Sequence, residues 1–139
     1  MNWTQLGLSV LAVLVLAGVA RLLRLGESRI GGVADARRFA EEALAGFEAH
    51  AAVVGTDGCA AVVAGTFGRA DRGSAGAALA VLKRHGAQVA ARRLLAPLAL
   101  GEATEGVTVR TGERLFGDVI LLGVLASDVR ALEASLTRV

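Results

Sequence analysis

The sequence lacks tyrosine and has a single cysteine, Cys59, among its 139 residues. One cysteine cannot form an intramolecular disulfide, and it cannot supply the several thiolates of a cysteine-based zinc site. A free thiol fits a reducing compartment. A fold held together by disulfides or by cysteine-bound zinc is therefore excluded.

Aromatic residues are also few: Trp3, Phe39, Phe47, Phe67 and Phe116. Proteins that bind single-stranded nucleic acid stack the bases on aromatic side chains, so this chain has few candidates for such contacts. Its formal net charge is only +2, with acidic residues interleaved among the arginines. We therefore predict no nucleic-acid partner.

Motifs for metals, cofactors and catalysis are missing. The two histidines, His50 and His85, have no HxH or HExxH spacing with another ligand. Cys59 opens an apolar stretch, which favours a small buried residue over a nucleophile. The sequence thus predicts no catalytic residue, no cofactor and no metal.

Residues 68–74, GRADRGS, are similar to a phosphate-binding P-loop but fail its requirements. Ser74 stands where the motif needs lysine, and Ala75 replaces the hydroxyl that binds magnesium. We expect the glycines of this region to form a loop between two strands: Gly65, Gly68, Gly73 and Gly76.

A long apolar run begins the chain. Residues 6–20, LGLSVLAVLVLAGVA, carry no charge. With Trp3 before the run and the residues to Leu23 after it, the helix has about 21 residues, or roughly 31 Å, which matches a bilayer core. We predict that Leu6 to Leu23 contact the lipid bilayer as a single transmembrane helix.

Two alternatives to this helix are a buried core helix and a cleaved signal peptide. The small residues Gly18, Val19 and Ala20 suit a signal peptidase, but the first five residues carry no lysine or arginine. Five arginines come after the uncharged run 6–20: Arg21, Arg24, Arg29, Arg37 and Arg38. By the positive-inside rule they predict a cytoplasmic domain on an inner-membrane, single-pass anchor.

The rest of the chain predicts a small domain with helices at both ends. Residues 34–50 place Phe39, Ala43 and Phe47 at helical steps, and such a helix is expected to dock on the domain's own sheet. At the other end, Ser127 is a candidate N-cap, followed by Val129, Leu132 and Leu136 at helical spacing.

Between these helices, short apolar stretches alternate with glycine-bearing turns, a pattern typical of an antiparallel meander. The stretches are Ala51 to Val54, Cys59 to Ala64, Ala78 to Arg84, Gln88 to Leu94, Leu98 to Glu102, Val107 to Thr111 and Leu115 to Leu122. In the stretch from Gln88 to Leu94 one face is more polar than the other, which suits a sheet that is covered on one side.

The predicted fold class is therefore α+β: a transmembrane helix, an amphipathic helix, an antiparallel meander of about six strands and a C-terminal helix. We divide the chain into a tail (1–5), the span (6–25), a linker (26–33) and the domain (34–139). A meander followed by a helix resembles the general plan of pleckstrin-homology-like domains, an analogy of fold that implies no activity.

Three stretches carry a second resemblance: Val53–Gly65, VVGTDGCAAVVAG; Val81–Leu94, VLKRHGAQVAARRL; and Thr111–Gly117, TGERLFG. They resemble short, uncharacterised single-span membrane proteins of GC-rich bacteria. This resemblance implies an anchored bacterial protein, and no activity or site residue comes with it.

One constellation is a candidate binding site. A turn at Gly86 would fold Lys83, Arg84 and His85 against Arg92 and Arg93. The four lysine and arginine side chains would then give a basic patch for anionic lipid or a protein partner. Solvated charges at a hairpin tip are the alternative. The function predicted is a non-catalytic binding or scaffolding domain at the membrane surface; the alternatives are a small enzyme with a non-local site and a periplasmic envelope domain.

Overall fold

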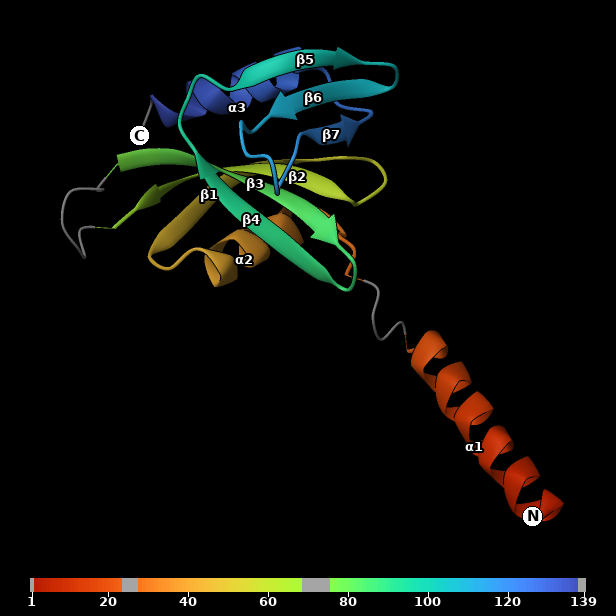
Figure 1. Ribbon diagram of the computed structural model, residues 1–139. Helices are drawn as coiled ribbons and strands as arrows, with labels where there is room; N and C mark the ends of the chain where they lie inside the picture. The colour runs from red at the N-terminus through yellow and green to blue at the C-terminus, as the bar shows by residue number, and fades with distance from the viewer. Residues whose placement is uncertain (1, 24–27, 69–75, 138–139) are drawn as a thin grey trace.

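The structure is a computed structural model that describes residues 2–23, 28–68 and 76–137 (Figure 1). Within these residues the helices are α1 (Trp3–Leu22), α2 (Val33–Ala43) and α3 (Ala126–Leu136). The strands are β1 (Phe47–Val54), β2 (Ala60–Phe67), β3 (Gly76–His85), β4 (Gln88–Leu94), β5 (Ala99–Ala103), β6 (Gly106–Arg110) and β7 (Val119–Leu122). Arg24 and the predicted loop at residues 69–75 lie outside the described part.

Helix α1 has 20 residues, and none of them is buried against the rest of the described chain. Its length and apolar composition are sufficient to cross a membrane. It begins at Trp3, three residues before the predicted start at residue 6. A core helix would be mostly covered, so α1 does not have that role in the described domain.

The predicted α+β class is confirmed. Seven strands in succession precede the last helix of the described chain, and they divide into two antiparallel sheets. Sheet A has the order β1-β2-β3-β4, and sheet B has the order β5-β6-β7. The chain passes from one sheet to the other after β4, around Pro97.

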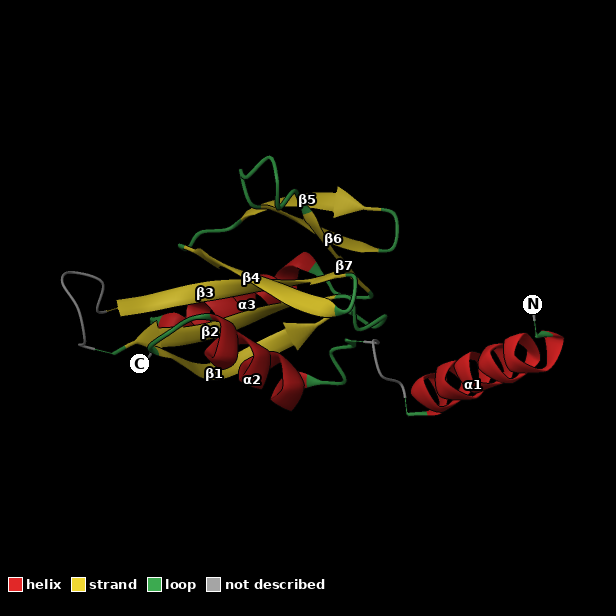
Figure 2. Cartoon of the chain, turned by 60° about the horizontal axis from the view of Figure 1, so that its bottom comes forward, coloured by secondary structure: helices red, strands yellow, loops and turns green. Residues whose placement is uncertain are grey.

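Sheet A is covered on both faces, which differs from the single covered side that the alternation in β4 suggested. Figure 2 shows sheet B above sheet A and α2 below it. In β2 and β3, one set of alternate residues, such as Val62 and Leu79, packs with α3 and sheet B. The other set, such as Val63 and Leu82, packs with α2. Two-sided burial explains why residues 60–65 of β2 and 78–82 of β3 are all apolar.

Helix α2 docks on sheet A, as predicted, but it is shorter than residues 34–50. It buries Ala36 and Ala40, and Leu44 is already extended. Gly46 then takes a positive φ of 77°, so the chain turns and Phe47 begins β1. The helical spacing of Phe47 was therefore misleading, because pairing with β2 decides its conformation.

Helix α3 covers sheet A through Val129, Leu132 and Leu136, as the helical spacing predicted. Its N-cap is Leu125, so the prediction that Ser127 caps the helix is wrong. The carboxylate of Asp128 accepts a hydrogen bond of 3.1 Å from the Leu125 amide. This backward contact satisfies one of the free N–H groups at the start of the helix.

Two smaller expectations also change. Gly65 is not in a loop but within β2, where it lies against Phe47 and the carbonyl group of Glu48. Cys59 precedes β2 and is half-buried rather than buried, with its Sγ 3.8 Å from the Asp57 carbonyl oxygen. It lies at the edge of the core because the β1–β2 turn extends to this residue.

Candidate functional site

The candidate site lies on the hairpin of β3 and β4. Its turn contains Gly86, with a φ of 61°, which is a conformation that glycine adopts without strain. The strand register places Lys83 opposite Ala90 and Arg84 opposite Val89. Further from the turn, Val81 is opposite Arg92 and Ala80 is opposite Arg93.

This register divides the four predicted cations between the two faces of sheet A. Residues directly opposite each other in an antiparallel pair lie on the same face, and successive residues alternate. Lys83 and Arg92 therefore share the face of Val81, toward sheet B, whereas Arg84 and Arg93 share the face of Leu82, toward α2. The four cations that we predicted as one patch are thus divided into two pairs on opposite faces of sheet A.

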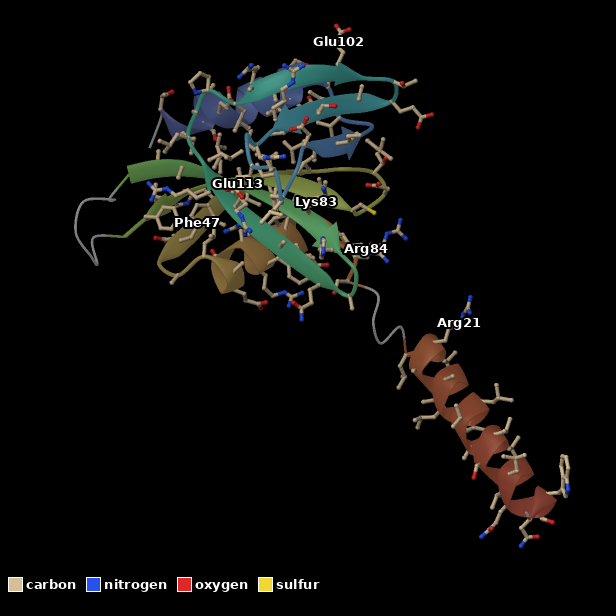
Figure 3. All side chains as sticks on the ribbon, viewed as in Figure 1. Arg21, Phe47, Lys83, Arg84, Glu102 and Glu113 are labelled. Atoms are coloured by element: carbon tan, nitrogen blue, oxygen red, sulfur yellow. The ribbon has the colours of Figure 1, made fainter. Side chains whose placement is uncertain are left out.

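Lys83 and Arg92 hold the loop between β6 and β7, residues 111–118. The Nζ of Lys83 donates a hydrogen bond of 3.0 Å to the Phe116 carbonyl oxygen. The Nε of Arg92 lies 2.9 Å from a carboxylate oxygen of Glu113. Both cations also lie over the Phe116 ring, at 5.9 Å and 5.0 Å from its centroid. These two residues therefore fasten the loop to sheet A. Lys83 of β3 and Glu113 of the loop are labelled in Figure 3.

The loop is also ordered by its own hydrogen bonds. Thr111 Oγ1 donates to the Gly117 carbonyl oxygen at 2.8 Å, and the Gly117 amide donates to the Glu113 carbonyl oxygen at 2.8 Å. Phe116 is buried, whereas Leu115 beside it is 101% exposed. The prediction that a strand begins at Leu115 is wrong, because this closed loop occupies residues 111–118 and β7 begins at Val119.

A hollow of about 220 Å³ lies beside this loop. Its lining combines three groups that can carry positive charge with apolar side chains: Lys83, His85, Arg92, Ala90, Leu115 and Phe116. Leu115 was not predicted as a site residue, whereas His85 was part of the predicted constellation. The glycines at 112 and 117, both with positive φ, are the sequence signal that could have indicated a closed loop here.

The other two predicted cations lie on the opposite face. The guanidinium carbon of Arg93 is 4.5 Å from the centroid of the Phe67 ring, so this residue covers the edge of the core. Arg84 is exposed near the turn, and its Nε lies 3.4 Å from the Gly86 carbonyl oxygen. Of the four, Arg84 is therefore the cation that is most available to a partner.

The residues considered for catalysis or metal binding are not brought together. No group of three potential metal ligands occurs in the described residues. His50 lies 3.2 Å from the Thr66 hydroxyl on an exposed part of β1. A hollow of about 250 Å³ beside Cys59 is lined by Lys83, Arg84 and Asp118, and neither histidine belongs to its described lining.

Another hollow, of about 550 Å³, lies between the β5–β6 turn and the start of α3. Glu102 and Glu105 line it together with apolar residues that include Leu100 and Leu125. None of the predicted site residues belongs to it. Glu102 points away from the domain in Figure 3.

The loop contact of Lys83 gives a first testable prediction. We expect Lys83→Met to lower the free energy of local opening of the loop by about 1.5 kcal/mol, because a hydrogen bond from a charged donor contributes about that much to stability. Amide hydrogen exchange of Gly117 should then accelerate roughly tenfold. Arg84→Met is the matched control, since Arg84 faces the other side of the sheet; equal acceleration in both variants would contradict the assignment.

Comparisons of this chain with protein-family models, with curated proteins and with solved structures find no match. The basis for a functional proposal is therefore the chemistry and geometry of the residues themselves.

Proposed function

We propose that this chain is a single-pass membrane protein that presents a small, non-catalytic binding domain at the cytoplasmic surface of the inner membrane. The observation that carries the proposal is the contrast between α1 and the domain. The domain buries its apolar residues in two clusters on the faces of sheet A. Helix α1 buries none of its residues in the described chain.

The free energy of exposing α1 to water supports the membrane location. Large side chains such as Leu8 and Leu16 are 69% and 73% exposed. Burying one leucine or valine side chain contributes about 1.5 to 3 kcal/mol, and α1 presents many of them. A bilayer provides that burial along the whole helix, because 20 residues rise about 30 Å.

A binding role fits the chemistry of the domain better than catalysis does. Lys83 and Arg92 are engaged by the loop at 111–118, and Arg93 by the Phe67 ring, so these cations support structure. The exposed groups that remain around the hairpin turn, such as Arg84 and His85, lie on the surface and suit recognition of an anionic partner. The partner is a membrane lipid or another protein.

The orientation can be tested with reporter fusions after Val139. Arg21 in the last turn of α1 and the arginines that follow the helix, such as Arg29, predict a cytoplasmic domain. We therefore expect a cytoplasmic reporter such as green fluorescent protein to be active and alkaline phosphatase to be silent. Moving the positive charges to the other end of α1, by Arg21→Gln and Arg29→Gln with Asn2→Arg and Thr4→Arg, should reduce this bias. Strong phosphatase activity of the unaltered chain would overturn the orientation.

A further inference from the structure

One end of the domain is attached to the segment that leads from α1. Ser28 donates a hydrogen bond from its hydroxyl to the Ala87 carbonyl oxygen in the β3–β4 turn. The Ile30 amide donates to the Gly58 carbonyl oxygen in the β1–β2 turn at 2.9 Å. Ile30 itself is buried, so this segment is part of the domain core. In Figure 1 the β3–β4 turn lies on the side of the domain toward α1.

The length of the chain limits how far this end can move from α1. Four residues, 24–27, separate Leu23 from Ser28. An extended chain spans at most about 3.6 Å per residue, so Leu23 and Ser28 lie within about 18 Å of each other. If α1 crosses a bilayer, the two turns attached to Ser28 and Ile30 therefore stay close to the headgroups.

Exposed groups that can carry positive charge gather at this end of the domain. Arg29, Arg84 and His85 are exposed, and the aliphatic stem of Arg29 lies over Gly58. Arg21 is exposed on the last turn of α1 (Figure 3). Two acids lie nearby: Asp57 is half-buried and accepts a hydrogen bond from the Cys59 amide, and Asp118 is exposed beside Arg84.

Leu115 adds an apolar group next to these charges. Leu115 lines the same hollow as His85, and His85 is the last residue of β3 before the β3–β4 turn. The side chain of Leu115 is fully exposed. The loop that carries it is held by Lys83 and Arg92, so the exposed position is imposed by an ordered backbone. An exposed apolar side chain on a surface that also carries cations is the combination with which peripheral proteins enter the interface of an anionic membrane.

We infer that this end of the domain docks on anionic lipid headgroups of the bilayer that α1 crosses, with Leu115 entering the interface beside Arg29, Arg84 and His85. The inference rests on the proposed membrane location of α1. The membrane surface itself is then a binding partner of the domain. Docking would give the protein a second point of attachment and would fix which side of the domain faces the cytoplasm.

The test uses the full chain with tryptophan as a depth probe. Trp3 is the only natural tryptophan, so Trp3→Phe with Leu115→Trp places a single fluorophore at the loop. The protein is reconstituted into vesicles of phosphatidylcholine and phosphatidylglycerol whose acyl chains are brominated near the carbonyl. We expect bromine to quench most of the emission at position 115, and to quench less in vesicles of phosphatidylcholine alone.

Leu95→Trp in the same Trp3→Phe background is the matched control. Leu95 is 66% exposed and directly follows β4. The seven residues of β4 rise about 23 Å, so position 95 lies far from the β3–β4 turn. We expect bromine to leave its emission almost unchanged. Equal quenching at 95 and 115 would overturn the docking of a particular surface.

Charge neutralisation tests the contribution of the arginines. Because each cation near an anionic surface contributes about a fivefold preference, Arg29→Gln with Arg84→Gln should lower the ratio of docked to undocked domain about thirtyfold. Arg110→Gln is the control, since Arg110 is exposed on β6, opposite Ala99 in sheet B. Quenching at 115 that ignores both the arginines and the lipid charge would overturn the electrostatic part of the inference.

The unaltered chain separates failure of the inference from failure of the proposed function. If Trp3 is quenched by brominated lipid and a tryptophan at 115 is not, α1 is anchored and the docking inference is wrong. If neither is quenched, α1 does not enter the bilayer and the proposed membrane location fails together with the inference. Quenching at 3 and 115, without quenching at 95, supports both.

Discussion

Replacing Leu11 and Leu14 with arginine is expected to move the chain from the membrane fraction into the soluble fraction. Both residues lie in the middle of α1 and are exposed in the described chain. An arginine at the centre of a transmembrane helix costs about 2.5 to 3.5 kcal/mol. Two of them should therefore lower membrane insertion by more than about a thousandfold. Carbonate extraction followed by sedimentation measures the change.

The matched control places arginine at the end of the helix, at Leu22 and Leu23. These residues follow Arg21, and a long side chain at that depth can reach the headgroups with its charge. We expect this variant to stay in the membrane. Because α1 buries no residue against the domain, circular dichroism should show the same thermal unfolding of the domain in both variants. Retention of the Leu11 and Leu14 variant in the membrane would mean that α1 is not the anchor.

Gly65→Ala is expected to destabilise the domain by about 3 kcal/mol, at the upper end of the usual cost of overpacking. Gly65 lies in β2, opposite Ala49 of β1. A Cβ atom there would meet the Glu48 carbonyl oxygen and would lie 2.6 Å from Cζ of Phe47. The Phe47 ring also contacts Phe67, with centroids 5.1 Å apart, so it cannot move without losing that packing.

Urea unfolding of the purified chain in detergent micelles, followed by circular dichroism, measures this loss. The free energy of unfolding of a typical domain is about 5 to 15 kcal/mol, so the expected loss is a large fraction of the total stability. Gly68→Ala is the control, because among the described residues no heavy atom lies within 4 Å of the position that a Cβ atom would take there. We expect the free energy of unfolding of this variant to change by less than about 0.5 kcal/mol, as for most surface substitutions. Equal stability of the two variants would show that the Phe47 ring does not pack on Gly65.

Elements with a strong local pattern were predictable from the sequence. The apolar residues of α1 are contiguous, and the turns at Thr56–Gly58 and His85–Gly86 carry glycine at positive φ. Helix α3 has its apolar residues at steps of three and four. These signals need no knowledge of a partner, because backbone geometry and the side chain itself decide them.

Elements that depend on a partner strand were predicted less well. Phe47 continues the helical spacing of α2, yet it begins β1 because it pairs with Phe67. Leu115 looked like the start of a strand, yet it lies in a loop that Lys83 and Arg92 hold from another sheet. In both cases a contact with a residue distant in sequence outweighs the local preference.

The candidate site shows the same division. The sequence predicted that Lys83, Arg84, Arg92 and Arg93 belong to one hairpin, and the structure places them there. It could not predict that the register separates them into two pairs on opposite faces, because a shift of one residue would reverse every assignment. Leu115 was missed because it meets His85 only through the β6–β7 loop, thirty residues further along the chain.

By itself, the sequence determined the apolar helix at the N-terminal end, the α+β class and the order of the elements, since these follow from local periodicity and turn chemistry. The tertiary structure decided the division into two sheets, the burial of sheet A on both faces and the side on which each cation lies. These features depend on which strands pair and in which register. Pairing is a property of distant segments, so only the folded chain determines which side chains meet.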